Sequence, residues 1–366
     1  MDFLKKVDKV FLFTTLILVF AGFLIFSSAS MGLLARSGAS FSTVALKQII
    51  VGFIGGGAAM LILSNVKYTF YKKYAFHILF ASIVLTFCVF IPGLGFSHGG
   101  ATRWISILGF TFQPAEILKL AFVIYLAAWL SKNIKKNHIF MNGLVPVLVI
   151  FGVVSFTLLL QTDTDTLAVM LVAGTVMYFV SGASLKHIAL IFMIGVIGMS
   201  ALAYTRPYIK DRIMTLVDPT RDALGSGYQI SQSLIAVGSG GIAGRGFGQS
   251  VQKFNYLPEP IGDSIFAVAA EEFGFMGSVM LLLLFLAFTL RGLYIAAHSP
   301  DNFSKFLVLG IIILIITQSL VNISAMIGII PLSGIPLVFV SHGGTAMLIA
   351  LAEIGVILNI SKYLKH

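Results

Sequence analysis

The chain has 366 residues, of which 58% are hydrophobic and only 10% are charged, and its mean hydropathy is +1.00. A soluble globular protein of this length cannot cover so much apolar side chain with so little charge, so that class is excluded. The net charge of +10 does not indicate nucleic-acid binding, because most of the basic residues lie in short loops between apolar runs. The composition predicts an all-α, polytopic membrane protein.

The apolar runs begin near the start of the chain, where residues 10–27 follow Lys5, Lys6 and Lys9. We interpret this run as the first membrane helix and not as a signal peptide, because further apolar runs follow it and no cleavage site leads into a soluble domain. Ten runs are long enough to cross a hydrocarbon layer about 30 Å thick. They are 10–27, 45–63, 74–91, 114–130, 144–160, 166–181, 187–204, 265–290, 306–324 and 344–361.

One connector differs from the short polar loops that separate most of these helices. The segment from about 205 to 264 is too polar to sit in lipid and too long for a turn, which predicts a large extracytoplasmic loop between helices 7 and 8. No internal repeat or linker-like tract divides the chain, so we expect a single domain over 1–366. The one cysteine, Cys88, lies inside an apolar run, which excludes a disulfide within the chain.

Lysine and arginine are distributed unevenly between the two sides of the predicted bundle. If the N-terminus is cytoplasmic, that side holds fourteen of them, whereas the short loops on the opposite side hold three. Basic residues in short loops favour the cytoplasmic side, and those in long loops count for little. The pattern therefore predicts that both termini are cytoplasmic and that the large loop faces outward.

Two charged residues, Glu116 and Lys119, lie three positions apart inside the fourth predicted helix. This spacing places them on one helix face, close enough to form an ion pair. Ionisable residues within a membrane span usually face the interior of a bundle. We interpret them as a structural pair beside a polar cavity, and the alternative is a charged lining for a substrate path.

Two aspartates, Asp163 and Asp165, lie in a tight outward hairpin between helices 5 and 6. The sequence Thr-Asp-Thr-Asp-Thr is typical of a turn and of a helix N-cap, which is the favoured interpretation. Carboxylates on the outer side are also the ligands that a hard divalent cation, Mg or Mn, prefers. A metal site at this pair is therefore the alternative, although the spacing matches no known ligand pattern.

The large outer loop is rich in glycine between residues 238 and 248. A nucleotide-binding loop is excluded, because no Walker lysine follows these glycines and no βαβ unit surrounds them. Glycine-rich, moderately apolar backbone suits an interfacial segment that lines a cavity. Its N–H groups, together with Arg245, are candidates for binding an anion.

A second candidate for anion binding precedes the last predicted helix. Backbone N–H groups at a helix N-terminus attract phosphate, and this terminus lies on the outward side. An ordinary helix cap with a kink is the equally supported alternative. The residues concerned are Ser341, Gly343, Gly344 and Thr345.

Three acids lie around the start of the eighth predicted helix: Asp263 just before it, and Glu271 and Glu272 within its first turns. Acids beside hydrocarbon are costly unless they are paired or functional. We expect the two glutamates to hold the outer loop and the helix in register. Asp263 and the basic and glycine-rich segments predict an outward-facing site for an anionic, amphiphilic substrate; no serine–histidine–acid set, zinc motif or nucleotide motif accompanies it.

Four blocks, in order along the chain, carry a family resemblance. They are GATRWISILGFTFQPAEILKL (100–120), LLLQTDTDT (158–166), DALGSGYQISQSLIAVGSGGIAGRGFGQSVQKFNYLPEPIGDSIFAVAAEEFGF (222–275) and GIIPLSGIPLVFVSHGGTAMLIALAEIGVILNIS (328–361). These blocks resemble the SEDS family (shape, elongation, division and sporulation), which includes FtsW, RodA and SpoVE. With ten spans and one large outer loop, the resemblance covers essentially the whole chain. The Tyr-Leu-Pro-Glu-Pro at 256–260 is more similar to the division or sporulation branch, hence FtsW-like.

The resemblance implies a peptidoglycan glycosyltransferase that polymerises lipid II at the outer face of the bacterial cytoplasmic membrane. In the family, the aspartate that ends the Leu-Pro-Glu block is essential, and it matches Asp263. As a general base it would accept a proton from the 4-hydroxyl of the acceptor N-acetylglucosamine. That hydroxyl would attack the anomeric carbon of the donor N-acetylmuramic acid with inversion and expel undecaprenyl diphosphate. Burial at the membrane edge is expected to raise the pKa of the base.

The departing diphosphate needs positive charge or N–H groups around it. The candidates for binding it are Arg103, Arg245 and the helix start at 341–345, with a divalent cation as an alternative. Glu116 and Lys119 match a Gln-Pro-x-Glu-x-x-Lys block of the family and are assigned to the lining of the cavity.

The chain departs from the family pattern in three places. Ile261-Gly262-Asp263 replaces the usual His-Thr-Asp, 161–166 replaces Gln-Pro-Asp-x-Gly-Thr, and 341–345 replaces Ser-Tyr-Gly-Gly-Ser. Asp263 and Asp163 are kept, but the histidine that the family has two residues before the base is replaced by Ile261.

The partner that the resemblance implies is a class B penicillin-binding protein, a single-span transpeptidase, together with other division or elongation membrane proteins and no nucleic acid. Two other functions stay open: a lipid II flippase or other transporter, for which the intramembrane ion pair would suit a polar headgroup, and a non-catalytic scaffold of the division machinery.

Overall fold

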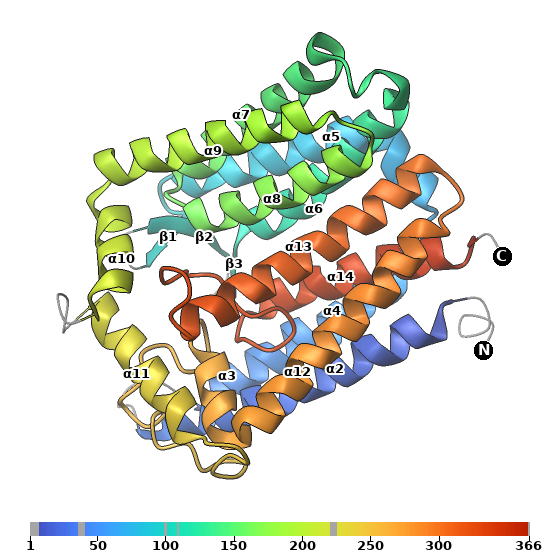
Figure 1. Ribbon diagram of the computed structural model, residues 1–366. Helices are drawn as coiled ribbons and strands as arrows, with labels where there is room; N and C mark the ends of the chain where they lie inside the picture. The colour runs from blue at the N-terminus through green and yellow to red at the C-terminus, as the bar shows by residue number, and fades with distance from the viewer. Residues whose placement is uncertain (1–6, 36–40, 99–100, 108–109, 220–224, 365–366) are drawn as a thin grey trace.

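The computed structural model describes residues 7–35, 41–98, 101–107, 110–219 and 225–364. Lys5 and Lys6 of the predicted N-terminal flank lie outside these ranges. The described chain folds into a bundle of long helices that run roughly side by side, with both termini at the same end (Figure 1).

Nine helical segments in the described ranges are long and apolar enough to cross a membrane, and a tenth apolar helix, α8, is shorter at 17 residues. Every predicted span therefore corresponds to a helix, but the structure confirms nine spans by length and not the predicted ten. The α-helices of these segments are α2 (Lys9–Ser30), α3 (Phe41–Lys47), α4 (Gly56–Asn65), α5 (Tyr68–Phe87), α6 (Pro114–Lys132), α7 (Val145–Leu160), α8 (Thr164–Val180), α9 (Leu185–Thr205), α12 (Ile265–Ala297), α13 (Asn302–Met326) and α14 (Gly344–Ser361). Short 3-10 or π segments are η1 (Met31–Ala35), η2 (Gln48–Gly55), η3 (Cys88–Phe90), η4 (Ile134–Lys136) and η5 (Phe140–Leu144).

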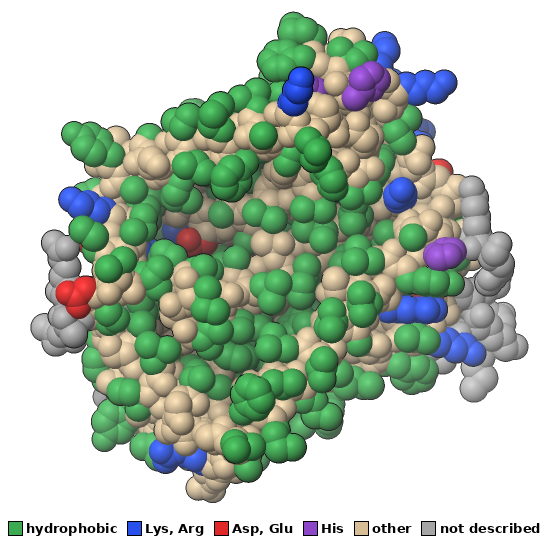
Figure 2. Space-filling model, viewed as in Figure 1, with side chains coloured by type: hydrophobic (Ala, Val, Ile, Leu, Met, Phe, Trp, Pro, Cys, Tyr) green, Lys and Arg blue, Asp and Glu red, His purple; other side chains and the backbone are tan. Residues whose placement is uncertain are grey.

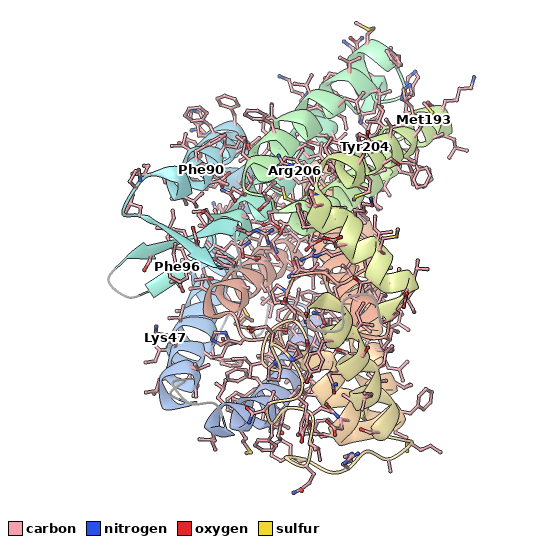
Figure 3. All side chains as sticks on the ribbon, turned by 90° about the vertical axis from the view of Figure 1, so that its left-hand side faces the viewer. Lys47, Phe90, Phe96, Met193, Tyr204 and Arg206 are labelled. Carbon is pink, nitrogen blue, oxygen red and sulfur yellow. The ribbon has the colours of Figure 1, made fainter. Side chains whose placement is uncertain are left out.

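The end of the bundle opposite the termini carries the elements that do not span it. Two shorter helices, α10 (Pro207–Val217) and α11 (Ser226–Ser239), come from the predicted large loop and stand across this end (Figure 1). A three-stranded antiparallel sheet, which the sequence analysis did not predict, is built from β1 (Gly95–His98), β2 (Ala101–Ile107) and β3 (Phe110–Phe112). Figure 3 faces this end, with Phe96 of the sheet on one side and Arg206, at the junction of α9 and α10, on the other.

The helices differ in how deeply they are buried. Most of the residues of α6, α13 and α14 are covered by other parts of the protein, so these helices form the centre of the bundle. By contrast α9 is almost entirely uncovered, and its apolar side chains face outward, as expected for a helix in contact with lipid. The polar residues of the central helices are therefore enclosed in protein.

The long helix α12 is interrupted near its start. Gly274 has φ +66°, and a Cβ atom there would lie 2.3 Å from the backbone nitrogen of Gly244. The break lets the glycine-rich loop pair with α12 through hydrogen bonds from Phe275 N to Gly241 O and from Met276 N to Ile242 O, of 2.9 and 3.1 Å. The glycine-rich loop is thereby fixed to α12 in the first half of that helix.

Candidate functional site

Asp263 lies in the turn that leads into α12, at the end of the molecule opposite the termini. Its carboxyl group points to the same place as the side chains of Asp165 and Arg212. A Cβ atom added to Gly334 would lie 3.8 Å from Asp263 Oδ2, 3.8 Å from Arg212 Nη2 and 3.9 Å from Asp165 Oδ2. Three charged side chains from three parts of the chain therefore converge beside one glycine, within van der Waals contact of the position that a Cβ atom would take.

The two neighbours of Asp263 are bound to each other. Arg212 of α10 donates a hydrogen bond of 2.9 Å to Asp165 Oδ2, in the first turn of α8. The same oxygen accepts a hydrogen bond of 3.0 Å from the backbone N–H of Gly334. One face of the guanidinium group is thus held by Asp165, while the whole group stays close to the carboxyl of Asp263.

Arg103 of β2 forms a second basic group at this end. It makes an ion pair of 3.6 Å with Asp163 and donates hydrogen bonds to the backbone carbonyls of Gln161 and Thr162. Asp163 also accepts a hydrogen bond of 3.1 Å from Gln113 and caps α8 through Thr166 N. The predicted N-cap role of Asp163 is therefore observed in the structure.

Burial changes the acidity of both aspartates. The pKa of Asp263 is raised to about 7, mainly by desolvation and also by the charges of Glu259 and Asp165, while the charges of Arg212 and Arg103 lower it. Desolvation likewise raises the pKa of Asp163, and its ion pair with Arg103 counteracts this. A carboxyl with a pKa near 7 is suited to accept a proton from a substrate at neutral pH.

A groove opens from the paired Asp165 and Arg212. It offers about 340 Å³ of space between α8, α9, α10, α13 and residues 330–333, and its lining is mostly aliphatic. The space-filling view shows a hollow in this region, lined by hydrophobic side chains, with acidic and basic side chains at its inner end (Figure 2). A charged end that continues into an apolar groove fits a ligand with an anionic head and a hydrocarbon tail.

The segment before α14 lies against the turn that holds Asp263. The Ser341 hydroxyl donates a hydrogen bond of 2.8 Å to Gly262 O and accepts one of 2.8 Å from Leu337 N. His342 N donates to Ile261 O at 2.7 Å, and Gly343 N donates to Gln48 Oε1 at 3.1 Å. The leading N–H groups of Ser341 to Gly343 are therefore used within the protein, and α14 begins at Gly344, followed by Thr345.

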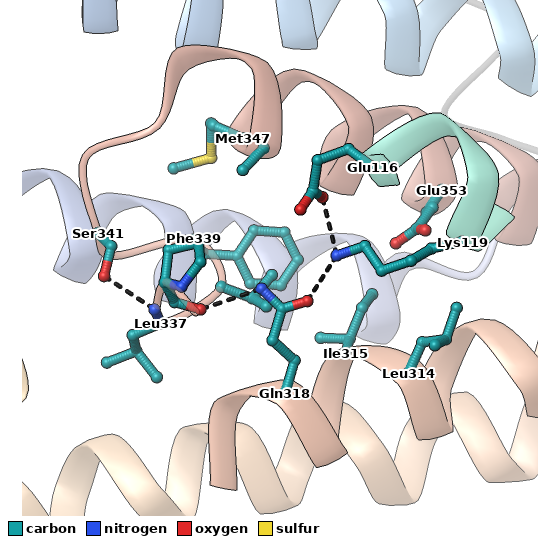
Figure 4. A pocket seen from close by; sticks show the side chains of 13 residues that line it. Glu116, Lys119, Leu314, Ile315, Gln318, Leu337, Phe339, Ser341, Met347 and Glu353 are labelled. Carbon is teal, nitrogen blue, oxygen red and sulfur yellow. Dashed lines mark hydrogen bonds and ion pairs between the residues drawn. The ribbon is translucent and has the colours of Figure 1, made fainter. Parts of the chain in front are cut away.

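The predicted pair of Glu116 and Lys119 is observed on α6, with 2.8 Å between Glu116 Oε2 and Lys119 Nζ. Lys119 also donates a hydrogen bond of 2.6 Å to Gln318 Oε1 of α13. Both groups line a small cavity at the centre of the bundle, shared with Glu353 of α14 (Figure 4). The expectation of an ion pair beside a polar cavity agrees with this geometry.

Glu271 and Glu272 belong to a separate, fully enclosed cluster. Lys253, itself 0% exposed, donates to Glu272 Oε1 at 2.7 Å. Backbone N–H groups of 248–252 bind both carboxylates at 3.0 to 3.3 Å. Arg245 lies here, 3.4 Å from Glu271, and not in the group around Asp263. The carboxylates of the chain's own glutamates are thus bound by N–H groups at the end of the glycine-rich loop, at Gly248, and just after it, at 250–252.

The predicted metal pair does not fit a divalent cation in this structure. Asp163 and Asp165 are each bound to a different arginine, and a guanidinium group so close repels a cation. Within the described ranges, no group of three or more His, Cys, Asp or Glu side chains is placed to hold a metal ion. No step of the chemistry is assigned to a metal.

Several residues of this region were missed by the sequence analysis. Arg212 was counted only among the charges of the large loop, and nothing in its neighbours in the sequence indicates that it reaches Asp165. Gln318 and Asn322 carried a signal, because two amides four positions apart in an apolar span share one helix face and require polar partners.

The fold and this site together define a class: an integral membrane protein of bundled helices with a partly buried acid, flanked by arginines, at one end. The family model described as a cell cycle protein, FtsW/RodA/SpoVE, matches residues 8–366. The chain therefore belongs to the FtsW/RodA/SpoVE family.

Individual relatives agree with this assignment. The chain is 40% identical over 322 residues to stage V sporulation protein E of Bacillus subtilis strain 168, covering 88% of each chain. It is 37% identical over 357 residues to a probable peptidoglycan glycosyltransferase FtsW of Geobacter sp. strain M18, covering 97% of this chain and 96% of the relative.

Solved structures share the fold. A peptidoglycan synthase complex, described as coordinating polymerization and crosslinking, contains a chain with a TM-score of 0.75 and 26% identity, over 94% of this chain and 97% of that one. A variant of the rod shape determining protein RodA of Thermus thermophilus matches with a TM-score of 0.72 and 22% identity, over 98% of this chain and 99% of that one.

Proposed function

We propose that the chain is a peptidoglycan glycosyltransferase that polymerises lipid II, with Asp263 as the general base. The observation that carries this proposal is the partly buried carboxyl of Asp263, which lies beside Arg212 and Asp165 where these two residues line the end of an apolar groove. The relatives named as probable peptidoglycan glycosyltransferases support the reaction.

In the proposed reaction, Asp263 accepts the proton of the acceptor 4-hydroxyl as its oxygen attacks the anomeric carbon of the donor sugar. The bond from that carbon to the diphosphate oxygen breaks, so the configuration inverts and undecaprenyl diphosphate leaves. The guanidinium groups of Arg212 and Arg103 stabilise the negative charge on the leaving group. Arg212 takes the part first expected of Arg245, which is bound to Glu271 instead.

The groove between α8, α9, α10 and α13 accommodates the polyisoprenoid tail of the donor in this proposal. Its aliphatic lining offers hydrocarbon contact, and it ends at Arg212, where the diphosphate would sit. The small cavity at Glu116 and Lys119 is not part of this path. Ser341 holds the turn before Asp263 in place through Gly262.

Both termini lie at one end of the bundle, and lysine and arginine side chains gather there (Figure 2). The positive-inside rule favours a cytoplasmic location for that end. We therefore propose that the protein lies in the bacterial cytoplasmic membrane with both termini inside and Asp263 on the outer side. A class B penicillin-binding protein is the proposed partner, supported by the resemblance to a complex that couples polymerization and crosslinking.

The test is polymerisation of purified lipid II by the purified chain, alone and with its transpeptidase partner. Wild type is expected to form glycan strands, and Asp263→Asn is expected to lose at least about 10³-fold of the rate, because a general base is removed without changing the shape of the side chain. Lys210→Gln, an exposed change on the same helix as Arg212, serves as the control.

Retention of polymerisation by Asp263→Asn would contradict the assignment of the base. Translocation of lipid II headgroups across liposome membranes that requires Glu116 and Lys119 would support the transporter alternative. A wild-type chain that never polymerises, even with its partner, would point to a scaffold.

A further inference from the structure

Two amide side chains on α13 connect the centre of the bundle to the turn that carries Asp263. Asn322 donates two hydrogen bonds through Nδ2, one of 2.8 Å to the backbone carbonyl of Asp263 and one of 2.9 Å to Ile335 O. Gln318, one helical turn earlier, donates a hydrogen bond of 3.0 Å to Pro336 O. The two amides thus bind the consecutive carbonyls of Ile335 and Pro336.

Gln318 is itself fixed from the other side. Its Oε1 accepts the 2.6 Å hydrogen bond of Lys119, whose ammonium group is paired with Glu116 at 2.8 Å (Figure 4). The ion pair therefore determines which way the amide of Gln318 points, since the oxygen must face Lys119 and the nitrogen must face Pro336. A charged pair enclosed in the bundle orients a loop at its outer end.

The segment held in this way is the one that shapes the site. Residues 334–341 include Gly334, on which Asp263, Asp165 and Arg212 converge, and Ser341, which binds Gly262 next to Asp263. Asn322 is 0% exposed and Gln318 is 5% exposed, so water does not replace their hydrogen bonds when they are removed. Loss of either amide would release the backbone of residues 334–341, which fixes the position of Asp263.

We propose that Asn322 and Gln318 are positioning residues, which hold Asp263 and residues 334–341 in the geometry required for glycosyl transfer, with Lys119 and Glu116 orienting Gln318. The inference rests on the proposed function of Asp263 but concerns residues that do not touch the substrate. A displacement of about 1 Å at a reacting group costs on the order of 10²-fold in rate, which sets the expected size of the effect.

The test compares Asn322→Leu and Gln318→Leu with wild type in lipid II polymerisation across pH 5 to 9, using the full chain. Asn322→Leu is expected to lower kcat by about 10²-fold with little change in KM, and Gln318→Leu to lower it less. In both, the acidic limb of the kcat profile moves to lower pH, because a loosened turn hydrates Asp263 while its charged neighbours Glu259, Asp165, Arg212 and Arg103 are unchanged.

Ser319→Ala is the matched control on the same helix. Ser319 is 0% exposed, and its hydroxyl bonds only to Ile315 O of its own helix, so the change leaves kcat and the limb as in wild type. Should Asn322→Leu not fold, Asn322→Ala, which removes both hydrogen bonds without adding bulk, carries the test with the same expected loss. Leucine is preferred to aspartate, since a new charge beside Asp263 would itself alter its pKa.

Hydrogen–deuterium exchange of residues 259–264 and 334–343 provides a readout that needs no activity. The two leucine variants are expected to exchange faster than wild type in both segments, with the rest of α13 unchanged. If the leucine variants exchange faster but the wild-type protein does not polymerise lipid II, the proposed function is contradicted, and the two amides still hold these segments in place. An unchanged exchange, or a lower kcat with an unmoved acidic limb, would overturn the positioning role and leave Asp263 as the base.

Discussion

Asp263 and the pair Glu271 and Glu272 lie within nine residues of each other around the start of α12, and their surroundings differ. Glu271 and Glu272 are 0% and 1% exposed, and their oxygens accept hydrogen bonds from Lys253, serine hydroxyls and a row of backbone N–H groups. Asp263 is only partly buried, and its charged neighbours Arg212 and Arg103 are held by other aspartates.

The difference separates two structural acids from the acid that we propose as the general base. The carboxylates of Glu271 and Glu272 accept hydrogen bonds from backbone N–H groups of residues 248–252 and thereby hold this loop on the helix. A carboxyl that is desolvated without such partners has a raised pKa, here about 7 for Asp263, and is ready to take up a proton. The same stretch of sequence therefore contributes both the acids that anchor the loop and the proposed general base.

The largest expected effects come from removing each kind of acid separately. Asp263→Asn removes activity, by at least about 10³-fold, and leaves a folded protein. Glu272→Gln leaves Lys253 as an unpaired buried ammonium and is expected to remove about 3–5 kcal/mol of stability. Thermal unfolding and polymerisation measured on the same preparations check both statements.

Ser278→Ala on α12 is the control for the glutamate, because that hydroxyl bonds only to Gly274 O within its own helix. A Glu272→Gln variant as stable as wild type would show that the enclosed cluster does not anchor the loop. A loss of folding in Asp263→Asn would show that the comparison between the two acids is wrong.

An intermediate effect, a shift in the pH dependence of activity, is expected when the charges around Asp263 are removed. Glu259→Gln removes a negative charge that raises the pKa of Asp263, so the acidic limb of the kcat/KM profile moves to lower pH. Arg212→Gln removes a positive charge that lowers it, so the limb moves to higher pH. Each shift is expected to be about half a unit, because Glu259 is exposed and Arg212 is shared with Asp165.

The opposite signs are the discriminating feature of this experiment. Lys210→Gln controls for a change of net charge at the same end of the molecule. Shifts of the same sign in the two variants would indicate a general disturbance of the site and not a titration of Asp263.

The smallest expected effect is on stability. Since the pKa of Asp263 is raised to about 7 in the folded protein from an ordinary 3.8, the unfolded chain releases this proton more readily, and stability falls as pH rises through that window. Asp263→Asn avoids the cost, so its Tm at pH 8 is expected to exceed that of wild type by about 1–3 °C. The difference disappears below about pH 4, and a variant that is less stable at pH 8 would contradict the raised pKa.

Much of the architecture was predictable from the sequence, because an apolar run long enough to cross a membrane indicates a helix. The pair of Glu116 and Lys119 was predictable from helical spacing, and the N-cap of Asp163 from turn composition. The sheet at 95–112 was not, since its short strands lie in a connector without a clear alternating pattern.

The assembly of the site was harder to predict because its members are distant in sequence. Asp165, Arg212 and Gly334 meet only when α8, α10 and the segment before α14 have packed at one end of the bundle. The glycine-rich surroundings of Arg245 favoured it over Arg212 in the sequence, but Arg245 is paired with Glu271 and Arg212 lies beside Asp263.

The most direct test of the role of Asp263 is the pH dependence of lipid II polymerisation by the wild-type protein, measured at saturating substrate between pH 5 and 9. The account expects the rate to rise through about pH 7 as the base ionises and then to level off, with no such rise in the residual activity of Asp263→Asn. A limb near pH 4, or the same limb in both proteins, would contradict it.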